Sequence, residues 1–113
     1  MELEVSIDET HAGCKIIRAT GEIDHHTFSV FEEAMEHCLN AKPALIVVNF
    51  GGVSYVSSSG IGILMHACAS QLEREAKLVL VGLNETVTGA LKLVGILDLV
   101  PTAKTEADAL KLK

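Results

Sequence analysis

Three consecutive serines, Ser57, Ser58 and Ser59, separate an apolar strand-like run from an apolar helix-like run in the stretch VSYVSSSGIGIL, residues 53–64. A serine can act as a nucleophile when a general base and an oxyanion site lie beside it. Neither the GxSxG pattern nor an SxxK arrangement is present, and His66 lies two turns into the following helix, pointing away from the loop. The loop therefore does not predict an enzyme, and we expect no catalytic residue.

The segment Gly60-Ile61-Gly62 raises a second possibility, a nucleotide site. It is only a fragment of the glycine-rich dinucleotide fingerprint, because the third glycine is missing at its proper spacing. The lysine of a phosphate-binding loop is absent as well. We therefore expect no nucleotide and no other cofactor.

A serine hydroxyl at the start of a helix has a different use. Free backbone N–H groups and the positive end of the helix dipole make this position tolerant of a phosphate group. Gly60 and Gly62 leave the backbone bare, so the surface of another protein can approach it. Phosphorylation adds about −1.5 to −2 charges, which can abolish a docking surface without unfolding the domain. The alternative is that Ser58 or Ser59 merely caps the helix.

Composition limits the classes of partner. A chain of 113 residues, of which 49% are hydrophobic, predicts one folded domain over residues 1–113. The formal net charge of −6 disfavours nucleic acid and anionic membrane surfaces. No apolar run approaches the roughly 20 residues that span a bilayer, and the acidic start MELEVSIDE is not a signal peptide.

Cysteine and histidine positions do not indicate a metal site or a disulfide. Cys14, Cys38 and Cys68 are widely spaced and form no CxxC motif, so we expect buried thiols in a cytoplasmic protein. His25 and His26 are adjacent on an extended or turn segment, where their side chains should point apart. Without a third ligand nearby they do not predict zinc.

The serine loop needs a scaffold, and the hydrophobic pattern predicts one. Strands alternating with helices after an opening hairpin predict an α/β layer with a mixed sheet and about four helices. The N-terminal half is expected to form a hairpin (2–7 and 14–21), a helix (27–40) capped by Thr27, a buried central strand (44–50) and a loop (51–59), with or without a short extended piece. The C-terminal half is expected to form a helix (59–73) with a stripe of Ile61, Leu64, Cys68 and Leu72, a strand (77–82), a helix (84–95), an edge strand (98–100) and a last helix (105–113) capped by Thr105 with Asp108.

Three stretches of this sequence resemble the STAS domain, and within it the stand-alone bacterial anti-sigma factor antagonists. They are ATGEIDHHTFSVFEEAM (19–35), LIVVNFGGVSYVSSSGIGIL (45–64) and LKLVGILDLVPTAKTEADAL (91–110). GEIDHHT, residues 21–27, is close to the GELDHHT pattern of the antagonists. The resemblance covers nearly the whole chain, and it implies a STAS-like fold.

The resemblance also implies a switch by partner exchange. Such an antagonist binds an anti-sigma factor that is itself a serine kinase, and thereby frees a sigma factor. The kinase phosphorylates one loop serine, which breaks the complex, and a metal-dependent serine phosphatase restores it. The sequence does not determine the oligomeric state, and our working expectation is a cytoplasmic monomer that forms heterocomplexes. The alternative is a constitutive STAS scaffold, or a subunit of a signalling or transport complex, in which the loop is never phosphorylated.

Alignment on Gly60 implies the roles of the three serines. Ser58 falls on the phosphorylated serine of the family pattern DSSG, Ser59 on the second serine and Ser57 on the aspartate. Ser58 is therefore the expected acceptor, with Ser57 as the runner-up. The missing charge at Ser57 is a departure that could alter partner choice or regulation. Asn49, where such antagonists often carry aspartate, is a second and milder departure.

The expected partner-binding set joins the two motifs. It consists of Glu22, Asp24, Ser57, Ser59, Gly60, Ile61 and Gly62. For Asp24, a turn or helix-cap role is an equal alternative. Tyr55 could lie at the same docking face, but we expect it to cover the core instead.

Overall fold

A hairpin opens the chain. The computed structural model describes residues 2–112. Strand β1 (Leu3–Asp8) pairs antiparallel with β2 (Cys14–Ile23), in a register that runs from Leu3 opposite Gly21 to Asp8 opposite Ile16. The predicted hairpin is therefore confirmed.

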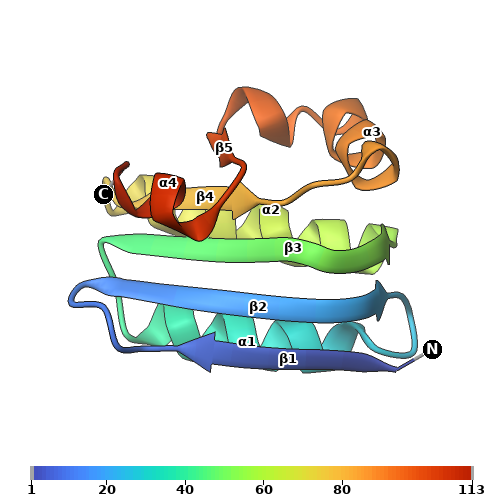
Figure 1. Cartoon of the computed structure of the whole chain (residues 1–113), viewed down its shortest axis with the longest axis horizontal. Helices are drawn as coiled ribbons and strands as arrows, with labels where there is room; N and C mark the ends of the chain where they lie inside the picture. Colours follow the sequence, from blue (N-terminus) through green and yellow to red (C-terminus); the bar gives the residue numbers. More distant parts are fainter. Residues whose placement is uncertain (1, 113) are drawn as a thin grey trace.

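Three crossovers then add parallel strands one after another (Figure 1). The remaining elements are α1 (Phe28–Asn40), β3 (Leu45–Val56), α2 (Ser58–Glu73), β4 (Lys77–Val81), α3 (Glu85–Leu93), the 3₁₀ helix η1 (Ile96–Asp98), β5 (Thr102–Ala103) and α4 (Glu106–Leu110). The strands lie in the order β1-β2-β3-β4-β5, and every pair after the hairpin is parallel. This confirms the predicted mixed sheet, opened by an N-terminal hairpin and backed by four α-helices.

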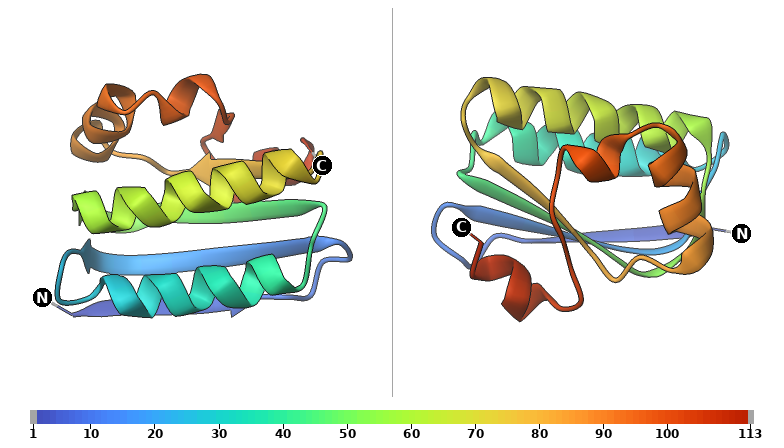
Figure 2. Two further views of the ribbon diagram at one scale, coloured as in Figure 1. Left: turned by 180° about the vertical axis from the view of Figure 1, so that it is seen from behind. Right: turned by 90° about the horizontal axis from the view of Figure 1, so that it is seen from above.

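The two faces of the sheet are covered unequally. Helices α1 and α2 lie side by side on one face, and α4 lies on the other (Figure 2). The larger hydrophobic cluster fills the α1–α2 side and includes Phe31, Leu64 and residues of α3. A smaller cluster under α4 contains Ile16, Val47 and Ala109. No helix in residues 2–112 is both long and apolar enough to cross a bilayer.

Strand β3 is the centre of the sheet and is longer than the sequence predicts. Leu45–Val48 are fully buried, which confirms the expected strand covered on both faces. The predicted loop over 51–59 is wrong in extent, because the extended piece that the sequence allows here is a continuation of β3 to Val56 alongside β2. Glycine permits this pairing, since a Cβ at Gly52 would lie 2.6 Å from Thr20 Oγ1. The glycine pair thus allows close approach where the register shifts, rather than ending the strand.

Two further expectations differ from the structure. The predicted edge strand over 98–100 is wrong: η1 and a turn occupy this segment, and β5 forms at Thr102–Ala103. In α2, Leu72 was expected in the apolar stripe but is 51% exposed, while Gln71 is buried and donates to the backbone oxygens of Lys77 and Pro43. The buried polar side chain joins the end of α2 to β4 instead.

Two of the predicted helix caps form as the sequence indicates. Asn84 Oδ1 accepts a hydrogen bond from Val87 N at 2.8 Å, and Thr105 Oγ1 accepts one from Asp108 N at 3.1 Å. Cys14, Cys38 and Cys68 are buried thiols, as expected. Burial raises the pKa of the Cys38 thiol to about 11, so this side chain stays protonated near neutral pH.

Helix α4 is held by charged and polar side chains of the sheet. The Arg18 guanidinium donates to both oxygens of Glu106, and Asn49 Nδ2 donates to Glu106 Oε2 at 2.7 Å. Arg18 also reaches Asp8 Oδ2 at 3.0 Å. The hydrogen bond from Arg18 is the first cause that keeps the pKa of Glu106 below its ordinary value. Asn49 therefore serves the attachment of α4.

Candidate functional site

The serine loop begins where β2 and β3 end together. Ile23 pairs with Val56 as the last residues of the two strands, and Ser57 N donates to Ile23 O at 2.7 Å. The chain then turns directly into α2 at Ser58. The first sequence motif (21–27) and the serine motif (57–62) are therefore brought together at one end of the sheet.

The three serines occupy different positions at this helix start. Ser57 is the N-cap: it is extended, and its Oγ accepts from Gly60 N at 3.5 Å. The expectation that Ser58 or Ser59 caps the helix is wrong, because β3 extends to Val56 and places the cap one residue earlier. Ser58 is exposed, and its hydroxyl has no hydrogen-bond partner within residues 2–112, whereas Ser57 and Ser59 are half-buried. Ser58 thus presents the most accessible hydroxyl of the three.

Gly60 and Gly62 have different physical roles. Gly60 is buried, and a Cβ there would lie 2.6 Å from Ile23 Cγ2 and 2.7 Å from Val56 Cγ1. Gly60 therefore lets α2 approach the sheet closely instead of baring its backbone to a partner. At Gly62 a Cβ would meet nothing within 4 Å, so this glycine does leave an open surface. Ile61, between them, is half-buried and packs against the core.

Asp24 organises the turn before α1. Its Oδ1 accepts hydrogen bonds from His26 N at 2.8 Å and from Thr27 N at 3.0 Å. Thr27 stands at the N-cap position, but its hydroxyl donates to Glu22 O at 2.7 Å and does not cap the helix. The bond from His26 is the first cause that lowers the pKa of Asp24. The turn role of Asp24 is therefore real, and the residue remains half-exposed beside the serine motif.

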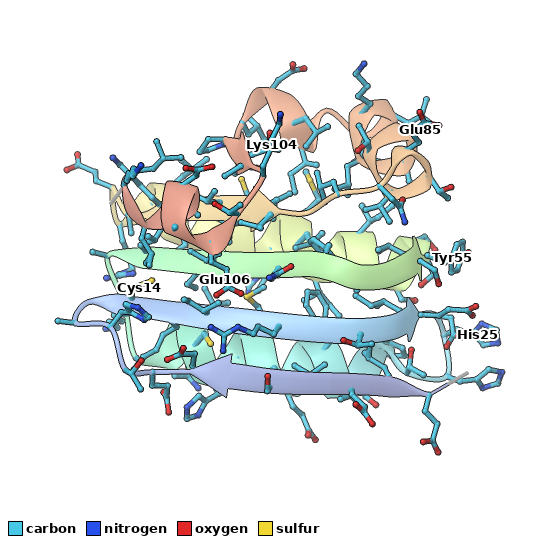
Figure 3. All side chains as sticks on the ribbon, viewed as in Figure 1. Cys14, His25, Tyr55, Glu85, Lys104 and Glu106 are labelled. Carbon is cyan, nitrogen blue, oxygen red and sulfur yellow. The ribbon has the colours of Figure 1, made fainter. Side chains whose placement is uncertain are left out.

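Aromatic side chains gather at the same end of the sheet. Tyr55 was expected to cover the core but is 46% exposed; it pairs with Glu22 across β3 and β2. Figure 3 shows Tyr55 and His25 at this end of the sheet. The rings of His25 and His26 lie 4.0 Å apart between centroids, so the expectation that they point apart is wrong. Within residues 2–112, no group of three or more potential metal ligands is found.

A groove between α1 and α2 leads away from the serine loop, and sequence reasoning did not find it. It has a volume of about 270 Å³, an apolar floor that includes Phe28 and Met35, and Ser59 at one end. Two glutamates of α1, Glu32 and Glu36, line it as well. Their outward position on α1 follows from the helical pattern, but only the packing of α1 beside α2 places them next to the serines.

The site thus combines an exposed hydroxyl at a helix N-terminus, an ordered turn and an acidic rim. Exposed polar groups of two helix starts and two strand ends surround it, which is the composition of a protein-contacting surface. Asn49, by contrast, belongs to the α4 attachment on the other face of the sheet.

The model of the STAS domain family matches residues 6–109, so the chain belongs to this family. Two relatives are named for a function: an anti-sigma-B factor antagonist of Listeria monocytogenes is 27% identical over 108 residues, covering 96% of this chain and 95% of the relative. An anti-sigma F factor antagonist of Paenibacillus polymyxa is 25% identical over 111 residues, covering 97% and 94%. The resemblance stated from the sequence motifs is confirmed.

The fold agrees with this assignment. The crystal structure of an anti-sigma factor antagonist from Mycobacterium paratuberculosis superposes with a TM-score of 0.86 at 24% identity. The match covers 97% of this chain and 92% of the other. The arrangement of five strands and four helices described above is therefore that of a solved STAS protein.

Proposed function

We propose that this protein is an anti-sigma factor antagonist, which binds an anti-sigma serine kinase and thereby releases a sigma factor. The observation that carries the proposal is the exposed Ser58 hydroxyl at the start of α2, next to the turn held by Asp24. The named relatives share this family and nearly the whole chain length. The protein acts as a regulator and not as an enzyme, in the cytoplasm, as a monomer that forms heterocomplexes.

The docking surface comprises the exposed and half-buried members of the expected set. Glu22, Asp24, Ser57, Ser59, Ile61 and Gly62 contribute directly, and Gly60 contributes by seating α2. Tyr55 and the glutamates of the α1–α2 groove extend this surface. Its acidic character suits a basic patch on the kinase.

Phosphorylation of Ser58 ends the interaction. The Ser58 Oγ attacks the terminal phosphorus of ATP in the kinase, the bond to ADP breaks, and the hydroxyl proton passes to a base of the kinase. Three features favour Ser58 over Ser57: it is exposed, its hydroxyl is free of internal hydrogen bonds within residues 2–112, and it does not cap α2. A metal-dependent serine phosphatase removes the phosphate and restores binding.

The added charge acts on the surface and not on the fold. A phosphate brings about −1.5 to −2 charges beside Glu22 and Asp24, in a chain whose net charge is already −6. The N-terminal end of α2, a helix of 16 residues, tolerates an anion. The domain therefore stays folded while its complementarity to a basic partner patch is lost.

Intact mass and phosphopeptide mapping of the protein from its native cells, growing and stressed, test the proposal. One phosphate on Ser58 that varies with the condition supports the switch. Phosphate on Ser57 keeps the switch and moves the acceptor. An unmodified loop in every condition contradicts the proposal and favours the alternative, a constitutive STAS scaffold or transporter subunit.

A further inference from the structure

Strand β1 is one edge of the sheet and pairs with β2 on one side only (Figure 1). Among residues 2–112 no strand lies on its other side, so alternate backbone N–H and C=O groups of β1 point away from the sheet. The strand is also accessible, because residues 4–8 are all exposed or half-exposed. An edge of this kind can pair with an extended segment of another protein.

The features that commonly block a strand edge are missing from β1. Proteins protect such edges with lysine, proline or a β-bulge. The strand sequence LEVSID contains neither lysine nor proline, and β1 pairs with β2 in one continuous register from Leu3 to Asp8. The edge is therefore regular along its whole length.

A polar hollow lies beside this edge, on the face of the sheet that carries α4. It has a volume of about 400 Å³, and Glu4, Ser6 and Thr20 are among the residues that line it. Glu4 and Thr20 lie directly opposite each other on β1 and β2. Within residues 2–112, the Glu4 carboxylate and the hydroxyls of Ser6 and Thr20 have no hydrogen-bond or ion-pair partner. These groups can therefore receive a cationic side chain from another molecule.

The cations near this edge are already paired, which leaves Glu4 as a free negative charge. Arg18, which also lines the hollow, binds the carboxylates of Asp8 and Glu106. Lys15 Nζ lies 3.1 Å from Glu9 Oε1. A second copy of this chain, paired along β1, would bring two free Glu4 carboxylates onto one face of the joined sheet. A lysine or arginine of a different protein complements Glu4 instead.

The opposite face of the edge is apolar. Val5 and Ile7 are half-buried and pack against the larger hydrophobic cluster. Val30 of α1 is 43% exposed and lies on the same side of the helix as His37, two turns later. His37 Nε2 is 3.0 Å from Glu9 Oε1, directly after β1, so this side of α1 flanks the edge. Apolar side chains of an added strand can therefore cover Val5 and Val30.

We propose that β1 binds an extended segment of a partner protein in which lysine or arginine alternates with apolar residues. Successive side chains of a strand point to opposite faces, so this alternation matches the two faces of the edge. The basic side chains meet Glu4 and the hollow, and the apolar ones cover Val5 and Val30. Strands β2 and β3 separate β1 from the start of α2, and the inference requires neither phosphorylation of Ser58 nor the kinase.

The test uses a short fluorescent peptide that alternates lysine and valine. Fluorescence anisotropy measures its affinity, and NMR-detected hydrogen exchange of the full chain locates its site. We expect saturable binding, slower exchange of alternate amides in β1, and unchanged exchange in β4. The slower exchange separates strand pairing from attraction between charges alone, which would leave the β1 amides open to solvent.

Two variants test the two faces of the edge. Glu4→Lys should weaken binding about tenfold or more, because it reverses the charge that receives the basic side chains. Val30→Glu should weaken binding about tenfold, because it places a charge where the apolar side chains lie. Both residues are exposed, so thermal unfolding should show that the variants remain folded.

The chain offers matched controls away from β1. Glu73→Lys, at an exposed residue ending α2, makes the same charge change, and Val94→Glu alters a valine that is 44% exposed after α3. Both controls should bind the peptide as the unchanged protein does.

Several results would overturn the proposal. They are an absence of saturable binding, unchanged exchange in β1, equal losses in the controls, and equally tight binding of a glutamate–valine peptide. Self-association in sedimentation that Val30→Glu abolishes also overturns it, since a second copy is then the occupant.

Discussion

The Arg18 guanidinium donates two hydrogen bonds to the Glu106 carboxylate, from Nε to Oε2 at 2.8 Å and from Nη2 to Oε1 at 2.7 Å. The two residues are 88 positions apart in the chain, and the pair joins β2 to the last helix. Two-pronged pairing of this kind fixes orientation as well as distance. Helix α4 has only five residues, so few other contacts are available to hold it. This ion pair is therefore a main contact that positions α4 over the hydrophobic cluster of Ile16, Val47 and Ala109.

The pair predicts an acid-dependent loss of stability. The pKa of Glu106 lies below its ordinary value of 4.5, chiefly because Arg18 donates to it. A carboxyl whose pKa is lower in the folded than in the unfolded state stabilises the fold at any pH above its unfolded-state pKa. This contribution is lost as the pH falls through the pKa of the folded state. Urea unfolding should therefore show Glu106→Gln less stable than the unchanged protein at pH 7, with a difference that shrinks below about pH 4.5. A pH-independent difference contradicts this, and Glu85→Gln, at an exposed glutamate of α3, is the control.

The contacts of Asn49 predict the consequence of replacing it by aspartate, the residue that the family resemblance implies at this position. Its Nδ2 donates to Glu106 and its Oδ1 accepts from Gly51 N at 2.8 Å, so the amide satisfies both neighbours. Asn49→Asp replaces the donor by a second carboxylate and should cost about 1–3 kcal/mol of unfolding free energy at pH 7. Asn40→Asp, at the exposed end of α1, is the control. Equal denaturation midpoints for Asn49→Asp and the unchanged protein disprove the argument.

The two glycines of α2 predict changes of opposite sign. Gly60→Ala forces a Cβ against Ile23 and Val56 and should destabilise the fold by about 1–3 kcal/mol. Gly62→Ala meets open space and should stabilise α2 by about 0.5–1 kcal/mol. Thermal unfolding of both variants checks this. If both substitutions stabilise, Gly60 does not set the distance between α2 and the sheet.

Two substitutions of Asp24 can separate the contribution of its hydrogen bonds to the turn from the contribution of its charge to partner binding. Asp24→Asn keeps an oxygen for the N–H groups of His26 and Thr27, so stability should change little. Asp24→Ala removes these bonds and should cost about 1 kcal/mol. If the charge faces the partner, Asp24→Asn weakens binding to the kinase at nearly unchanged stability. Full binding by the asparagine variant leaves the turn as the role of this residue.

Ser58 variants test the switch directly. Ser58→Asp should lose affinity for the anti-sigma kinase by about tenfold or more, since it introduces charge at the docking surface. Ser58→Ala should bind and persist in the complex when ATP is added. Calorimetry with the cognate kinase measures both, and Ser70→Asp, on the same helix, is the control. Equal affinities of the aspartate and alanine variants would be incompatible with the switch.

The sequence predicts most of this fold because its signals are local. Periodicity places the hairpin, α1 and the central part of β3, and the side-chain caps at Asn84 and Thr105 form as their spacing indicates. The glycine-rich segment after Phe50 was predicted as a loop but is extended, because it pairs with β2. Pairing with β2 across two register shifts keeps it extended, which a single sequence does not reveal.

The wrong end predicted for β3 also changes the expected roles of the site residues. Because the strand continues to Val56, the cap falls on Ser57 and the exposed hydroxyl on Ser58. Tyr55, at the exposed end of β3, then faces solvent. The α1–α2 groove could not be predicted either, since it depends on how two helices pack and not on the pattern within each. Site residues that share a motif were found, and those joined only by packing were missed.

The order of the strands in the sheet follows their order in the chain. No strand has to be inserted between two that are already paired, so each crossover adds its strand to an existing edge. Each crossover also carries a whole helix, so the entropy of closing it is lost before the parallel pairing is gained. Only the β1–β2 hairpin pairs neighbours in the chain, and it can serve as the template on which each later strand is added in turn.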